Sequence, residues 1–132
     1  MSAVRVGVVE DSREDFLAVQ RILAPDVEVL RWPTGEQALA AFEGRDRLDD
    51  FALVIVDGNL PGMDGPEVVD AIRHIPGGDR ARLAVLSGSD DPALVTRALR
   101  AGADCFASKG STLQSLKNAV ALCMTEADAP AS

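Results

Sequence analysis

The chain has 132 residues, of which 47% are hydrophobic and 26% are charged, and its formal net charge is −8. This length and composition are typical of a single globular domain with a core of its own. The negative charge argues against nonspecific binding to nucleic acid or to an acidic membrane, and it is compatible with a divalent cation or a partner with a basic face.

No segment of the sequence is typical of a membrane protein or of a secreted one. The longest apolar run is too short to span a bilayer, and the first apolar segment meets Glu10 and Asp11 without a signal-peptide cleavage pattern. We therefore expect a cytoplasmic protein. In that reducing compartment Cys105 and Cys123, which lack the spacing of a metal site, are expected to be small buried residues.

Short apolar segments alternate along the chain with segments of helical periodicity. The segments predicted to be strands are residues 4–9, 27–32, 51–57, 83–86 and 104–108. Capping and first-turn residues mark the start of five helices: Asp11 or Ser12, Thr34, Pro66, Asp91 with Pro92, and Ser111 with Gln114. This alternation predicts an α/β fold, a parallel sheet with helices on both faces joined by right-handed crossovers. The domain is predicted to cover residues 1–124, followed by a flexible C-terminal tail over 125–132.

Asp57 stands at the end of the most apolar of these segments. Residues 51–56 form an unbroken apolar run, which predicts a strand buried on both faces of the sheet. A carboxylate is costly to desolvate, so it should emerge where the strand leaves the core. In open α/β sheets, ligands bind at this edge, beside the carboxyl ends of the strands.

Polar side chains also end three other predicted strands. These residues are Glu10 with Asp11, Ser87, and Lys109. Because the carboxyl ends of parallel strands share one edge, we expect carboxylates, a hydroxyl and an ammonium to meet there. Clustered carboxylates raise one another's pKa unless a cation neutralises them, and Mg²⁺ prefers such oxygen ligands. The hydroxyl and the ammonium can donate to phosphoryl oxygens, so the edge is a candidate metal and phosphoryl site with Asp57 as nucleophile.

This set of motifs resembles the receiver domain of two-component response regulators over almost the whole chain. The motifs are Glu10-Asp11, Val-Asp-Gly-Asn-Leu-Pro-Gly-Met-Asp-Gly over residues 56–65, Ser87-Gly88 and Lys109. The resemblance implies a flavodoxin-like, doubly wound fold. Its five parallel strands, numbered along the chain, would lie in the order 2-1-3-4-5, with five helices on both faces.

The resemblance also implies how phosphoryl transfer and metal binding are divided among the residues. Asp57 would accept a phosphoryl group from a phosphohistidine on a histidine kinase or a phosphotransfer protein. Mg²⁺ would be held by Glu10, Asp11, Asp57 and the backbone carbonyl of Asn59.

The remaining motif residues would bind the phosphoryl group and report its presence. Ser87, Lys109 and the backbone of Gly88 would contact the phosphoryl oxygens. Ser87 and Phe106 would form the conformational switch.

The implied function is that of a stand-alone, single-domain response regulator, a phosphoprotein that assists its own phosphorylation and dephosphorylation but is not a turnover enzyme. It would signal to a downstream protein by changing its surface, with no direct contact to nucleic acid or membrane. We expect that surface to be the fourth helix, fifth strand and last helix, around Leu94, Phe106 and Leu116, where a homodimer is a further option.

Two other functions fit parts of the pattern. The first is a docking module that keeps the fold but works without phosphorylation, against which the complete acidic pocket with its lysine argues. The second is a Mg²⁺-dependent phosphohydrolase with an Asp nucleophile. Such enzymes typically carry a second Asp two residues later, where this chain has Asn59.

The sequence departs from the family pattern at three positions. Glu10 stands where Asp is commoner, Phe106 where Tyr is frequent, and Gly110 where Pro usually follows the lysine. The usual Lys-Pro bond is commonly cis, but cis costs ~2.5–4 kcal/mol at a non-proline bond. We therefore predict a trans bond between Lys109 and Gly110.

Overall fold

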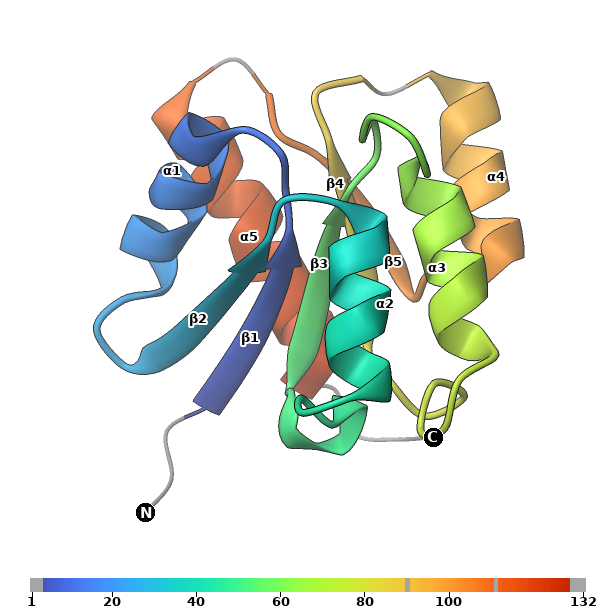
Figure 1. The fold of residues 1–132 in the computed structure, drawn as a ribbon. Helices are drawn as coiled ribbons and strands as arrows, with labels where there is room; N and C mark the ends of the chain where they lie inside the picture. The colour runs from blue at the N-terminus through green and yellow to red at the C-terminus, as the bar shows by residue number, and fades with distance from the viewer. Residues whose placement is uncertain (1–3, 90, 111, 129–132) are drawn as a thin grey trace.

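The structure, a computed structural model, describes residues 4–89, 91–110 and 112–128 (Figure 1). Strands and helices alternate along these ranges. The strands are β1 (Val4–Val9), β2 (Val27–Trp32), β3 (Leu53–Asp57), β4 (Leu83–Ser87) and β5 (Cys105–Ser108). The helices are α1 (Arg13–Leu23), α2 (Gly35–Glu43), α3 (Gly65–Arg73), α4 (Pro92–Ala101) and α5 (Leu113–Asp128), with a short 3-10 helix η1 (Leu48–Asp50) before β3.

The strands form one parallel sheet in the order β2-β1-β3-β4-β5. Helices α2, α3 and α4 cover one face of the sheet, and α1 and α5 cover the other (Figure 1). Because the strands are parallel, their carboxyl ends lie at the same edge, the upper one in Figure 1. The doubly wound fold and its strand order are therefore confirmed.

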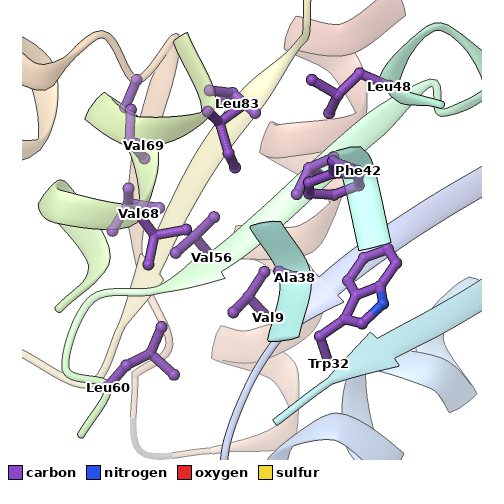
Figure 2. Close-up of a cluster of buried hydrophobic side chains, with 14 of the residues drawn as sticks. Val9, Trp32, Ala38, Phe42, Leu48, Val56, Leu60, Val68, Val69 and Leu83 are labelled. Atoms are coloured by element: carbon purple, nitrogen blue, oxygen red, sulfur yellow. The ribbon is translucent and has the colours of Figure 1, made fainter. Parts of the chain in front are cut away.

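The central strand β3 is buried along its whole length and separates two hydrophobic clusters. Val54 and Val56 belong to the cluster under α2, α3 and α4, whereas Leu53 and Ile55 belong to the one under α1 and α5. Figure 2 shows the first cluster, in which side chains from β1, β3, β4, α2 and α3 gather on one face of the sheet. Burial on both faces explains why the sequence of this strand is continuously apolar.

Aromatic side chains close one end of the first cluster. Trp32 packs edge-on against Phe42 and Phe51, with ring centroids 4.8 and 5.7 Å from its own. Gly7 in β1 makes room for the indole, because a Cβ at that position would lie 2.6 Å from an indole carbon. Trp32 is only 9% exposed and is therefore a core residue.

Helix α3 begins in the turn that follows Asp57. Asp64 is its N-cap, and a complete capping box joins Asp64 to Glu67 through both backbone N–H groups. The helix thus starts at Gly65, one residue before the predicted start at Pro66. The cap fixes the end of the turn and, with it, the path of the chain after β3.

Gly65 cannot be enlarged without moving the backbone of this turn, so Gly65→Ala is expected to destabilise the protein. A Cβ at Gly65 would lie 2.6 Å from the carbonyl oxygen of Asp57 and 2.8 Å from the Cα of Gly58. Since both neighbours are backbone atoms, no side-chain rotation relieves the clash, and we expect a loss of about 1–3 kcal/mol in urea unfolding. Gly88→Ala is the matched control, because no atom lies within 4 Å of a Cβ there. Equal stability of the two variants would contradict this account.

Helix α5 is longer than the sequence pattern predicts, and its predicted cap, Ser111, lies outside the described residues. It continues through Asp128, so a helix occupies part of the segment 125–132 that was predicted to be a flexible tail. Residues 125–128 contain no helix-breaking residue, and the next proline is Pro130, outside the described ranges. Neither α5 nor any other described helix combines the length and the apolar character that crossing a membrane requires.

The connection from β5 to α5 has the trans geometry predicted from its sequence. Within the described ranges the cis peptide bond joins Ala24 and Pro25, and the Lys109–Gly110 bond is trans. Gly110 has a φ of 70°, in the left-handed region that favours glycine. A Cβ on Gly110 would also collide with the side chain of Ser115. A residue with a side chain would therefore be strained directly after Lys109.

Candidate functional site

The turn between β1 and α1 carries the first two acidic residues of the site. Ser12 caps α1: its Oγ accepts from Asp15 N at 3.2 Å, and its N–H donates to Glu10 Oε2 at 3.3 Å. From β2, Arg31 donates to the carbonyl oxygens of Glu10 and Asp11, at 3.0 and 2.9 Å. The turn is therefore held by the helix cap on one side and by the neighbouring strand on the other. This restricts the positions of both carboxylates.

Glu10, Asp11 and Asp57 form an acidic cluster at the ends of the neighbouring strands β1 and β3. Each offers one carboxylate oxygen, and these oxygens lie within 4.8 Å of one another. Glu10 and Asp57 are buried, at 3% and 8% exposure, while Asp11 is exposed. Hard oxygen ligands with one side open to water are the donor set that Mg²⁺ takes in proteins. The cluster therefore fits a divalent cation.

Lys109 reaches this acidic cluster from the end of β5. Its Nζ donates to Glu10 Oε1 at 2.7 Å and lies 3.6 Å from Asp57 Oδ1. It also donates to Asp15 Oδ2 at 2.8 Å. The lysine side chain is only 14% exposed, so its charge has lost most of its hydration and is stabilised by these carboxylates instead.

Burial and mutual contact shift the protonation of the two central groups. Burial raises the pKa of the Glu10 carboxyl to about 7; the hydrogen bond from Lys109 offsets part of this rise, and Asp57 adds to it. Burial opposes the charge of Lys109, but the hydrogen bonds to Asp15 and Glu10 outweigh it and hold the pKa of the ammonium above its ordinary value. Near neutral pH, Lys109 is thus charged while Glu10 can still carry a proton in the metal-free protein.

Ser87 is fully buried at the end of β4. Its Oγ accepts hydrogen bonds from Asn59 Nδ2 at 3.0 Å and from Ser89 N at 3.1 Å. Gly58 allows this close packing, because a Cβ there would lie 2.9 Å from Ser87 Oγ and 3.2 Å from Leu94 Cδ2. The turn after β3 therefore lies directly against the end of β4, and the serine hydroxyl is bonded to that turn.

The other predicted site residues surround the same edge of the sheet. Asn59 N donates to Asp57 Oδ1 at 3.3 Å, and metal binding by the Asn59 carbonyl stays a prediction. Gly88 is exposed and lines, together with Lys109, a cavity of about 430 Å³ between α1 and α5. Phe106 is half-buried on β5 and packs against the hydrophobic cluster under α2, α3 and α4. Its role as a switch stays a prediction.

The sequence patterns do not identify Asp15 and Arg31 as parts of the site. A carboxylate in the first turn of a helix is ordinary because it favours the helix dipole, so nothing distinguishes Asp15. Its contact with Lys109 joins residues 94 positions apart. Arg31 lies opposite Val8 in the register of β2 with β1. The implied strand order places these two strands side by side, but it does not single out Arg31 among the residues of β2.

Comparison with known proteins agrees with this geometry. The sequence profile of the response regulator receiver domain matches residues 6–121. The Probable chemotaxis protein CheY of Rhizobium etli is 38% identical over 68 residues, which are 52% of this chain and 53% of that protein. The match spans 53% of the length of that CheY protein and 33% of the length of the Probable transcriptional regulatory protein NarL of Mycobacterium tuberculosis, which is 40% identical over 78 residues.

Solved structures of similar sequence have the same fold. The receiver domain of the response regulator NarL from Mycobacterium tuberculosis is 32% identical, with a TM-score of 0.72 over 95% of this chain and 98% of that one. The Mn²⁺-bound form of response regulator Rcp1, a Synechocystis protein, is 26% identical, with a TM-score of 0.77 over 92% of each chain. Since the family profile covers most of its length, this chain belongs to the family of response regulator receiver domains.

Proposed function

We propose that this receiver domain accepts a phosphoryl group on Asp57 from a phosphohistidine of a histidine kinase or a phosphotransfer protein. The observation that carries the proposal is the acidic cluster of Glu10, Asp11 and Asp57 with the Lys109 ammonium 3.6 Å from Asp57 Oδ1. A nucleophilic carboxylate beside both a cation-binding cluster and a fixed positive charge is what phosphoryl transfer requires.

The covalent step forms one bond and breaks another. A carboxylate oxygen of Asp57 bonds to phosphorus while the phosphorus–nitrogen bond to the donor histidine breaks, and the imidazole keeps the electron pair of that bond. Burial of Asp57 limits water at the reacting oxygen, and the Asn59 N–H, 3.3 Å from Oδ1, restricts rotation of the carboxylate. The product is an acyl phosphate on the protein.

A metal ion is part of this proposal. Glu10, Asp11, Asp57 and the Asn59 carbonyl would hold Mg²⁺, which would supply positive charge to offset that of the transferred group. The Mn²⁺-bound form of the relative Rcp1 supports a divalent cation in this family. The oxygen-only donor set of the acidic cluster favours Mg²⁺ as the ion that this chain uses.

Other residues of this edge would bind the transferred group and report its arrival. Lys109 and the backbone of Gly88, which line the same cavity, would bind phosphoryl oxygens together with the Ser87 hydroxyl. Ser87 would then turn away from Asn59, to which it is bonded at 3.0 Å, and Phe106 would move into the space beneath β4. The altered surface over α4, β5 and α5 would bind a downstream protein or a second copy of this chain.

Incubation with acetyl phosphate, with and without Mg²⁺, tests the proposal directly. We expect one phosphoryl adduct by intact mass, dependent on Mg²⁺, cleaved by hydroxylamine as an acyl phosphate is, and mapped to Asp57. An adduct on another residue would overturn the assignment. Multiple-turnover hydrolysis of phosphate monoesters would instead show a phosphohydrolase, because a phosphoacceptor that takes its group from a phosphohistidine or acetyl phosphate does not need to act on such esters.

A further inference from the structure

Asp15 contacts the centre of the site but has no part in the metal or phosphoryl binding proposed above. Its Oδ2 accepts a hydrogen bond from Lys109 Nζ at 2.8 Å, nearly as short as the 2.7 Å bond from the same nitrogen to Glu10. The acidic cluster that fits a cation consists of Glu10, Asp11 and Asp57 and leaves Asp15 outside. Asp15 therefore acts on the site through Lys109.

Two carboxylates already accept hydrogen bonds from Lys109 in this structure. An ammonium has three N–H donors, and two of them are used by Glu10 and Asp15. Asp57 Oδ1, at 3.6 Å, is an ion-pair partner but lies beyond hydrogen-bond distance. A phosphoryl oxygen on Asp57 is thus left with the third donor, and it competes with Glu10 and Asp15 for the position of the ammonium.

The two carboxylates that hold Lys109 differ in their surroundings. The Glu10 side chain is 4% exposed and belongs to the acidic cluster, whereas the Asp15 side chain is 48% exposed at the rim of the site. Asp15 and Lys109 also line the same cavity of about 430 Å³ between α1 and α5. Open space thus lies on the side of Lys109 that faces Asp15, and the lysine side chain has room to move there.

We propose that Asp15 is a positioning residue that draws the Lys109 ammonium toward α1 and competes for it with a phosphoryl group on Asp57. This inference rests on the proposed function. A cation bound by Glu10 and Asp57 takes up their negative charge, which leaves Asp15 as the carboxylate with the strongest attraction for Lys109. Asp15 thereby lowers the affinity of the site for the phosphoryl group and limits how long the phosphorylated state persists.

The test is the affinity of the full chain for beryllofluoride, a phosphoryl mimic, at saturating Mg²⁺, measured by fluorine NMR. Asp15→Asn keeps the shape of the side chain and the cap of α1, since Ser12 accepts from the backbone N–H of residue 15. We expect Asp15→Asn to bind beryllofluoride about two- to fivefold more tightly, as the loss of one partly exposed ion pair implies. Asp15→Glu keeps the carboxylate and should restore the wild-type affinity.

Glu14→Gln is the matched control, because Glu14 is an exposed acidic residue in the same first turn of α1. It removes the same charge and should leave the affinity unchanged. If Asp15→Asn binds no more tightly than Glu14→Gln, or binds more weakly than the wild type, the competition does not exist. A wild-type protein that binds no beryllofluoride with Mg²⁺ would overturn the proposed function itself, which is a different result.

Discussion

Asp57→Asn is expected to abolish the Mg²⁺-dependent phosphoryl adduct formed with acetyl phosphate. A carboxamide of the same size can still accept the hydrogen bond that Asn59 N donates to Oδ1, so the turn after β3 should be preserved. The amide, however, lacks the nucleophilic carboxylate oxygen and cannot form an acyl phosphate. Intact mass spectrometry after acetyl phosphate treatment measures the loss, which should be complete.

The same variant should not be less stable than the wild type when EDTA is present. Asp57 is 8% exposed, and its charge helps to raise the pKa of Glu10, so removing that charge relieves a buried repulsion. Asp70→Asn, on the exposed side of α3, is the matched control and should keep the full adduct. An adduct at the wild-type level in Asp57→Asn would show that another residue is the acceptor. A lower melting temperature would show that the Lys109 contact outweighs the repulsion.

Affinity for Mg²⁺ is expected to rise with pH up to about pH 7 and to level off above it. Burial raises the pKa of Glu10 from 4.5 to about 7, so the metal-free site holds a proton through the weakly acidic range. A cation bound at Glu10 must displace that proton, and the affinity should therefore change by about tenfold per pH unit well below pH 7. Calorimetric titration with Mg²⁺ at a series of pH values measures this slope.

The same proton gives the metal-free protein an unusual dependence of stability on pH. Because the pKa of Glu10 is higher in the folded state than its ordinary value of 4.5, the folded state binds more protons between pH 4.5 and about 7. The contribution of Glu10 to the free energy of unfolding should thus be greatest below this window and fall as pH rises through it, by at most about 1.4 kcal/mol per pH unit. Denaturant unfolding in EDTA at a series of pH values measures whether stability falls as pH rises through this window.

Glu10→Gln is the control for both pH effects, because glutamine cannot titrate. In this variant the Mg²⁺ affinity should be weaker and its slope below pH 7 should flatten. The stability of the metal-free variant should no longer fall across the same window. A wild-type affinity for Mg²⁺ that does not change between weakly acidic and neutral pH would show that Glu10 releases no proton when the metal binds.

The fold was predictable because its signals are local. The apolar run at 51–56 required a strand buried on both faces, and the structure buries all of β3 between two clusters. The alternation of strands and helices then required a parallel sheet, which brings the carboxyl ends of the strands to one edge. From this rule alone, Glu10, Asp11, Asp57 and Lys109 were expected to meet, and they do.

Some boundaries were less predictable because neighbouring elements decide them. The end of α5 had no sequence signal at Thr125, and the helix continues while each further residue still gains a backbone hydrogen bond. The start of α3 depended on Asp64 and Glu67, whose capping box forms only when the turn after Asp57 delivers them at helical spacing.

The sequence by itself determined which chemical groups stand at the ends of the strands, since residue type and strand direction suffice for that. Only the tertiary structure decided which of these groups pair with one another and how their pKa values shift. The distances of Lys109 to Glu10, Asp15 and Asp57 depend on how the sheet and α1 place the ends of β1, β3 and β5 relative to one another, across separations of up to 99 residues. The raised pKa of Glu10 likewise follows from burial, which no local pattern encodes. Side-chain direction and desolvation arise from packing, and packing is a property of the whole fold.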